Sequence, residues 1–174
     1  MEKAILDQLL SELKRSNLLV VESQNRKILL CDAVSKEAVD KVFQIASKES
    51  LPEVALLFPN INQVAAYFND VPEIVYDLFE LTNSPLEIIL GNAKNIETTL
   101  CNSNGFIAIR LAQSDAFKLI GKQFRKPLAM WEIKGTELPS TIHTIKLKLE
   151  EPERKKHQII EIGPKSTFRI IQSK

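Results

Sequence analysis

Short apolar runs alternate along this chain with segments of helical periodicity, and this alternation limits the possible folds more than any other feature. The runs predicted to be buried strands are 18–21, 28–31, 54–58, 86–90, 106–111, 128–133, 157–162 and 167–171. The segments predicted to be helices with one apolar face are 5–13, 35–46, 60–68, 72–79 and 114–124. Interleaved elements of this kind predict an α/β (α+β) fold in which helices flank a twisted mixed sheet.

Residues that commonly begin helices stand at the start of four of these segments. Ser35, Asn60 and Ser114 each carry a side-chain oxygen that can accept a hydrogen bond from the first helical turn. Pro72 suits a first turn because the N–H that it lacks has no intrahelical partner there. We therefore expect helices to begin at these four positions.

The composition bounds the class of protein. With 174 residues, of which 44% are hydrophobic and 26% charged, the chain is expected to form one globular domain over residues 1–174. The formal net charge is only +1, so any nucleic-acid contact must come from a local basic patch. Cys31 and Cys101 are too few for a disulfide scaffold and indicate a reducing compartment. No apolar run approaches the ~20 residues of a membrane helix, and residues 1–10 do not form a signal peptide, so we predict a cytoplasmic protein with no membrane contact.

Common catalytic and ligand-binding motifs are missing from the sequence. The five glycines are scattered and form neither a P-loop nor a dinucleotide-binding fingerprint, which excludes those folds. His143 and His157 have no ligand spacing with either cysteine, so no metal site is predicted. No serine or cysteine has a recognisable neighbouring base, and Cys31 is expected to be a buried structural thiol. The residues themselves therefore predict neither a catalytic group nor a cofactor.

Arg110 is unusual because it lies near the end of an otherwise apolar strand, 106–111. A buried or half-buried guanidinium needs an anion or several hydrogen-bond acceptors. One interpretation is an internal ion pair. The other is an anion-binding site at the carboxyl end of the strand, where open sheets bind ligands. The sequence leaves both interpretations open.

Several segments resemble the YrdC/YciO/TsaC family in the same order along the chain. The stretch V-E-S-Q-N-R-K-I-L-L-C-D-A, 21–33, is similar to the family motif Y-P-T-D-T-V-Y-G-L-x-x-D-A and matches it at Asp32 and Ala33. In addition, N-S-P-L-E-I-I-L at 83–90 resembles P-G-P-L-T-L-I-L, I-A-I-R at 107–110 resembles V-x-V-R, and P-L-A at 127–129 resembles the strand before T-S-A-N. The resemblance covers nearly the whole chain and implies a single YrdC-like domain with a concave, positively charged sheet face.

The resemblance also implies an activity. Active members of the family join threonine, bicarbonate and ATP into threonylcarbamoyl-adenylate, the precursor of a tRNA modification. Members are also commonly described as binding double-stranded RNA. On this basis the chain is expected to be linked to tRNA threonylcarbamoyladenosine modification or to translation.

The polar residues of the family motifs are mostly replaced in this chain. Ser23 keeps one hydroxyl of the P-T-D-T motif, whereas Gln24 and Asn25 replace its acid and its second threonine. In the K-x-R motif, Ala46 stands for the lysine and Lys48 for the arginine. Of the residues that bind anions in the family motifs, only two therefore keep a positive charge. Arg110 is unchanged, and Lys48 is a lysine in the place of an arginine.

Two further replacements affect the expected nucleotide site. M-W-E-I-K at 130–134 stands in place of T-S-A-N, and Gln172 falls where an arginine is expected. Trp131 can be a core residue, can fill space that the nucleotide needs, or can offer a ring on which a base stacks. The adenylation step develops negative charge on phosphate oxygens, and the loss of one stabilising donor typically costs ~3–4 kcal/mol. Because several such groups are missing, we expect no catalysis.

Three functions stay open at this point. The first is a non-catalytic YrdC-like protein that binds a protein partner or RNA, either double-stranded RNA or tRNA. Its candidate RNA contacts are Lys48, Arg110, Arg154, Lys155, Lys156, Lys165 and Arg169. The second is a divergent threonylcarbamoyl-AMP synthase or nucleotide-binding protein that uses ATP, with Ser23, Lys48, Arg110 and Trp131 as candidate ligand or anion contacts. The third is a purely structural protein, such as a homodimer or an accessory subunit.

Overall fold

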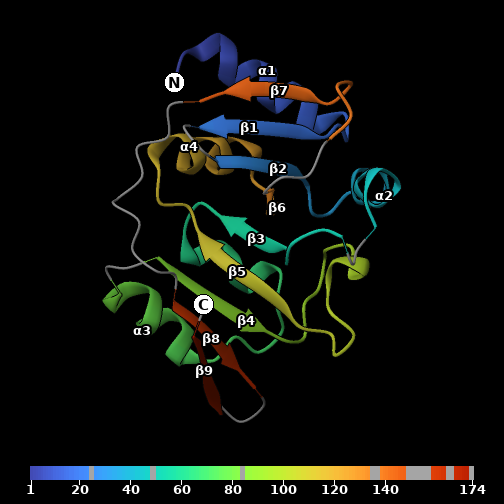
Figure 1. Ribbon diagram of the computed structural model, residues 1–174. Helices are drawn as coiled ribbons and strands as arrows, with labels where there is room; N and C mark the ends of the chain where they lie inside the picture. Colours follow the sequence, from blue (N-terminus) through green and yellow to red (C-terminus); the bar gives the residue numbers. More distant parts are fainter. Residues whose placement is uncertain are drawn as a thin grey trace.

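In the computed structural model, strands from all parts of the described chain meet in one mixed sheet (Figure 1). The structure describes residues 1–23, 26–47, 50–82, 85–133, 138–147, 158–163 and 167–172. The strands are β1 Leu19–Ser23, β2 Arg26–Asp32, β3 Ala55–Phe58, β4 Leu86–Leu90, β5 Ile107–Leu111, β6 Leu128–Ile133, β7 His143–Lys146, β8 Gln158–Ile162 and β9 Phe168–Gln172. The helices are α1 Lys3–Lys14, α2 Lys36–Ile45, α3 Glu73–Leu81 and α4 Asp115–Phe124, with short 3-10 turns η1 Ile61–Ala66 and η2 Thr98–Leu100.

The sheet has the strand order β7-β1-β2-β6-β3-β5-β4-β8-β9. The pairs β1–β7, β3–β5 and β4–β8 are parallel, and the other neighbouring pairs are antiparallel. The pairs β1–β2 and β8–β9 join strands that are consecutive in the chain. The predicted mixed sheet flanked by helices is confirmed.

The strand β7, at one edge of the sheet, was not predicted from the sequence. In H-T-I-K only Ile145 is buried, so neither an apolar run nor a clear alternation marks the strand. Its backbone pairs with β1, more than 120 residues earlier in the chain. Lys146, the first residue of the charged stretch 146–156, ends this strand, and residues 148–156 lie outside the described part of the chain.

Helices pack on both faces of the sheet and bury two separate apolar layers. On the first face, α2, η1 and α3 cover a core that includes Leu29, Phe58 and Ile88. On the second face, α1 and α4 cover a core that includes Leu30 and Met130. Helix α1 contacts β1 and β2, and α4 contacts β3, so this helical cover lies toward the β1–β2 end of the sheet (Figure 1).

The buried thiol of Cys31 fits the structural role predicted for it. Cys31 lies on β2 among the residues of the first-face core and is fully buried. Burial, and then the neighbouring Asp32 carboxylate, raise the pKa of this thiol above its ordinary value. The reactive thiolate is therefore suppressed at neutral pH.

In the described ranges, no helix has the length and apolar character that a bilayer crossing requires.

Two of the three predicted N-caps are confirmed and one is wrong. The Ser35 hydroxyl accepts a hydrogen bond from the Ala38 N–H at 3.2 Å, and Ser114 accepts one from the Phe117 N–H at 3.3 Å. Asn60 makes no such bond, and the residues after it form a short 3-10 turn instead of the predicted α-helix. Pro72 stands one residue before α3.

Ser114 caps its helix whereas Asn60 does not, and this difference can be tested by mutation. Replacing Ser114 with alanine is expected to lower the free energy of unfolding by about 1 kcal/mol, because the Phe117 N–H loses its acceptor. The matched control is Asn60→Ala, which is expected to change the stability by less than about 0.5 kcal/mol. The control removes an amide whose buried Oδ1 has no hydrogen-bond partner among the described residues. Urea unfolding of both variants measures the difference, and equal losses would contradict the assignment of Ser114 as a cap.

Candidate functional site

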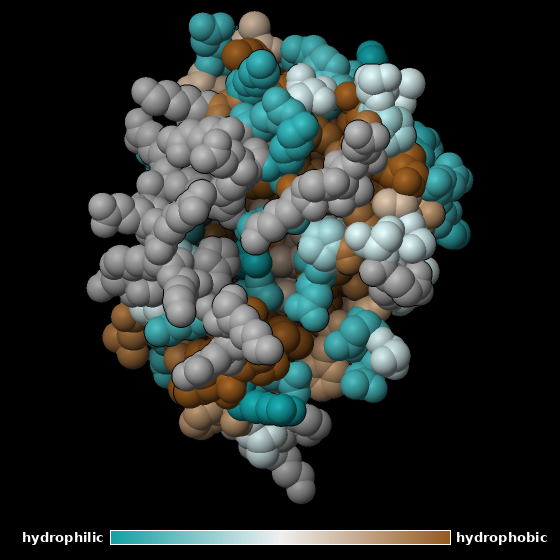
Figure 2. Space-filling model, in the orientation of Figure 1, coloured by the Kyte–Doolittle hydropathy of each residue, from teal (hydrophilic) through white to brown (hydrophobic). Residues whose placement is uncertain are grey.

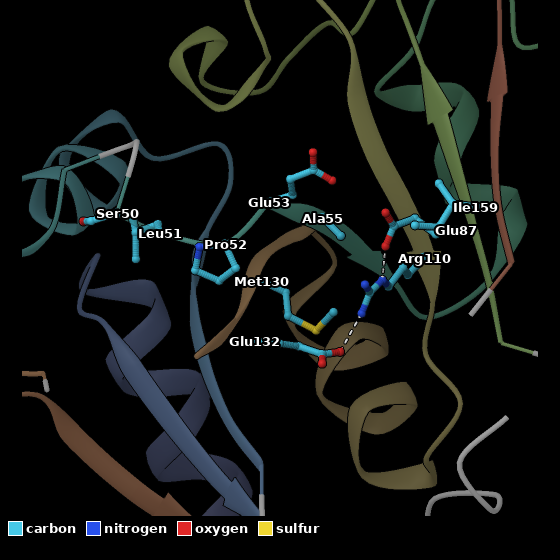
Figure 3. Close-up of a pocket in the computed structure, with 10 residues that line it drawn as sticks. All are labelled: Ser50, Leu51, Pro52, Glu53, Ala55, Glu87, Arg110, Met130, Glu132 and Ile159. Atoms are coloured by element: carbon cyan, nitrogen blue, oxygen red, sulfur yellow. Dashed lines mark hydrogen bonds and ion pairs between the residues drawn. The ribbon is translucent and has the colours of Figure 1, made fainter. Parts of the chain in front are cut away.

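A hollow of about 490 Å³ opens on the second face of the sheet beside Arg110 (Figure 3). Strands β3, β4, β5, β6 and β8 contribute its side chains, and the loop before β3 closes one side. The lining residues are Ser50, Leu51, Pro52, Glu53, Ala55, Glu87, Arg110, Met130, Glu132 and Ile159. The hollow therefore lies where the V-x-V-R-like strand brings its arginine to the sheet surface.

The guanidinium of Arg110 is held by two carboxylates from different strands. Glu87 on β4 is the direct cross-strand neighbour of Arg110, and its Oε2 accepts a hydrogen bond from Arg110 Nε. Glu132 on β6 accepts a second bond from an Arg110 terminal nitrogen at 2.7 Å. The small side chain of Ala55 on β3, the strand between β6 and β5, leaves room for the guanidinium to reach across (Figure 3).

Burial differs strongly within this triad. The Glu87 side chain is only 4% exposed, whereas those of Arg110 and Glu132 are 20% and 27% exposed. A carboxylate as deeply buried as Glu87 requires a charged partner, because an unpaired buried ion is very costly. Arg110 supplies that partner. Of the two interpretations that the sequence leaves open for Arg110, the internal ion pair is confirmed.

The described residues that line the hollow carry a net negative charge. Among the described lining residues, Glu53, Glu87 and Glu132 carry carboxylates and Arg110 carries the one cation, which gives a formal charge of −2. A phosphate that approached Arg110 would have to displace a carboxylate from it or stay close to three like charges. The resemblance implies a positively charged face, and the described part of this hollow departs from that expectation.

Trp131 does not face the hollow, so its predicted role as a ligand contact or as a plug of the cavity is wrong. Side chains alternate along β6, and Met130 and Glu132 point to the second face while Trp131 points to the first. The indole is 2% exposed and packs in the first-face core. The interpretation of Trp131 as a core residue, which the sequence also allows, is therefore confirmed.

The other predicted contacts are only partly described. Lys48, Arg154, Lys155, Lys156 and Lys165 lie outside the described residues. Ser23 ends β1, but nothing is described of its side chain. Arg169 is exposed on β9, opposite Glu161 on β8. Arg110 is therefore the one predicted contact that the described part of the chain brings to the hollow.

Sequence reasoning missed both partners of Arg110, although a signal for them exists. Glu87 is the one charge in the apolar strand 86–90, and Glu132 is the one charge in 128–133, just as Arg110 is in 106–111. Isolated charges in three buried strands can be accommodated together if they neutralise one another. Pairing the three by this rule would have favoured the internal ion pair over the anion site.

Asp32, which matches the family motif, has a structural role in this chain. Its buried carboxylate accepts a hydrogen bond from Lys126 Nζ at 2.7 Å and another from the Val34 N–H at 2.9 Å. These contacts connect the end of β2 to the residues that lead into β6. The Asp32 carboxylate is therefore held in place by groups of the fold.

Comparisons with solved structures agree on the fold. A Sua5 variant from P. abyssi is 16% identical, with a TM-score of 0.74 over 92% of this chain and 51% of its own. E. coli YciO is 14% identical, with a TM-score of 0.74 over 98% of this chain and 89% of its own. HypF from T. kodakarensis is 13% identical, with a TM-score of 0.69 over 98% of this chain and 24% of its own. The chain thus spans about half of the Sua5 chain and a quarter of HypF, and at these identities the likeness shows the fold alone.

The family comparison is more specific. No curated protein matches the sequence significantly. The model of the Sua5/YciO/YrdC family, whose description reads "Telomere recombination", matches residues 12–163, which is most of the chain. This family is related to the threonylcarbamoyl modification of tRNA. The match and the shared fold establish that the chain belongs to the Sua5/YciO/YrdC family.

Proposed function

We propose that this chain is a non-catalytic member of its family that does not bind ATP and acts by binding a protein partner. One observation carries the proposal: both carboxylates that face Arg110 bind its guanidinium, so the family's arginine serves the fold. An adenylate-forming site needs preorganised cations and donors directed at phosphate oxygens. In this chain the P-T-D-T motif keeps only the Ser23 hydroxyl, the K-x-R motif keeps only the cation of Lys48, and Arg110 is neutralised.

The charge of the hollow supports a protein partner over RNA. Phosphate contacts dominate the affinity of RNA-binding proteins and require clustered cations. The described lining of the hollow carries a formal charge of −2 instead. RNA binding stays a prediction that rests on the family resemblance and on the basic residues at 154–156.

A calorimetric titration with ATP tests the proposal. We expect no saturable heat with ATP up to about 1 mM. A dissociation constant above this concentration corresponds to a binding free energy weaker than about −4 kcal/mol. The protein is also expected to release no pyrophosphate from ATP in the presence of threonine and bicarbonate. The control is a family member whose P-T-D-T and K-x-R motifs are intact, titrated under identical conditions. One-site binding of ATP in the micromolar range, or pyrophosphate release at a rate near that of the control, would overturn the proposal.

A further inference from the structure

The last strand of the sheet, β9, presents an open and largely apolar edge. It pairs with β8 on one side and ends the strand order on the other, within the part of the chain that the structure describes. Phe168 and Ile170 are 67% and 64% exposed, although both are large hydrophobic residues. Figure 2 shows hydrophobic residues at the lower end of the molecule, where Figure 1 places α3, β8 and β9. Exposed edges of this kind are pairing sites unless charges, prolines or bulges protect them.

The hydrogen-bond pattern shows which backbone groups face outward. The Gly163 N–H donates to the Thr167 carbonyl at 2.7 Å, so these two residues form a hydrogen-bonded pair at the start of the β8–β9 ladder. Such pairs alternate with non-hydrogen-bonded ones in an antiparallel ladder. Arg169 and Ile171 therefore bond to β8, while the N–H and C=O groups of Phe168 and Ile170 point to the open edge.

The sequence of β9, F-R-I-I-Q, is suited to pairing with itself. An antiparallel pairing centred on Ile170 places Ile170 opposite its own copy, Phe168 opposite Gln172 and Arg169 opposite Ile171. All outward backbone groups then meet in register, which gives about six backbone hydrogen bonds. A pairing centred on Arg169 would instead place two arginines directly opposite each other, which is unfavourable. The charge of Arg169 therefore selects the register centred on Ile170.

The side chains agree with this register. Phe168 and Ile170 stand opposite Ile162 and Ile160, which are buried in the first-face core. A second copy would bring the two Ile170 side chains together on that face, with each Phe168 diagonal to the Ile170 of the other copy, and would continue the core across the twofold axis. The geometry points to a second copy of this chain as the occupant of the β9 edge, in a symmetric dimer whose two sheets join through β9. This inference does not depend on the proposed function, because it rests on a different surface.

Sedimentation velocity over protein concentrations of about 1–500 µM tests the dimer. We expect a shift toward twice the mass of one chain, with a dissociation constant on the order of 10 µM because a strand edge is a small interface. Ile170→Lys should weaken association on the order of 100-fold, since two apolar side chains are lost and two charges face each other. Phe168→Lys, at the other exposed apolar position, should also weaken it. The matched control is Leu119→Lys on α4, a partly exposed position away from the edge, and circular dichroism checks that every variant folds.

Hydrogen exchange gives a second readout that reports on the backbone directly. The amide of Ile170 should exchange rapidly in dilute protein and slowly at high concentration, whereas the amides of Arg169 and Ile171 should be protected at both. A monomer at all concentrations, a dimer that Ile170→Lys leaves intact, or an Ile170 amide that stays unprotected at high concentration would each overturn the inference.

Discussion

Replacing Arg110 with methionine is expected to lower the free energy of unfolding by about 3–5 kcal/mol at pH 7. The guanidinium is the cation that neutralises Glu87, whose side chain is 4% exposed and cannot be solvated where it lies. Methionine keeps much of the length of arginine but leaves the buried carboxylate without a partner. Urea unfolding followed by circular dichroism measures the loss.

Two further variants separate charge from packing in this result. The double variant Arg110→Met with Glu87→Gln removes both charges, and it is expected to recover most of the stability, to within about 1–2 kcal/mol of the original protein. The matched control is Lys36→Met, which breaks an exposed ion pair with Asp40 and should cost less than about 0.5 kcal/mol. If Arg110→Met costs no more than Lys36→Met, the triad does not stabilise the fold and Arg110 is available for a ligand.

Replacing Trp131 with alanine should produce a loss of similar size, about 3–5 kcal/mol, and lower the melting temperature by roughly 10 °C. The indole is 2% exposed in the first-face core, so its removal leaves a cavity between the sheet and the helices. Because Trp131 is the one tryptophan of the chain, its fluorescence reports on this environment. We expect emission typical of a buried indole that acrylamide does not quench and that ATP does not alter.

Leu81→Ala is the matched control for the core substitution. Leu81 is also a large apolar residue, but it is 81% exposed at the end of α3, so its truncation should cost less than about 0.5 kcal/mol. Equal losses for the two variants, or strong acrylamide quenching of the native protein, would show that Trp131 is not a core residue. The second result would also reopen its interpretation as a stacking surface.

The placement of Trp131 changes the reason for expecting no nucleotide at this site. The hollow beside Arg110 is not filled by the indole and keeps a volume of about 490 Å³. Space is therefore available, and the obstacle is charge: Glu87 and Glu132 already bind the guanidinium, and Glu53 adds a third carboxylate nearby. The proposal that ATP does not bind therefore depends on the charge of the hollow. Trp131 does not fill the space of the nucleotide, as the sequence had suggested it could.

Most of the fold could be predicted because strands and helices leave a periodic apolar pattern in the sequence. The segments around β3, β4, β5 and β6 are apolar runs that contain at most one charged residue each, and the structure has strands in all four. Local chemistry also located the caps Ser35 and Ser114. Asn60 failed as a cap: the residues after it form a 3-10 turn and its side chain makes no capping bond, although its residue type is as common at helix starts as serine.

The candidate site could be predicted only in part. Arg110 was recognisable as a charge in an apolar strand, yet its partners lie 23 residues before it and 22 residues after it in the chain. Neither separation corresponds to a local spacing rule, since strand neighbours are set by the order of the whole sheet. The same holds for β7, whose pairing partner is β1.

The sequence by itself determined the sheet-and-helix class, the family and the replacement of the motif residues, because apolar periodicity and residue identity are local properties. The tertiary structure alone decided that Arg110 is neutralised, that Trp131 faces the core and that β9 is the last of the described strands at one edge of the sheet. Each of these depends on strand register and on which face of the sheet a side chain occupies. A register is fixed by contacts between distant segments, and a shift of one residue reverses every face.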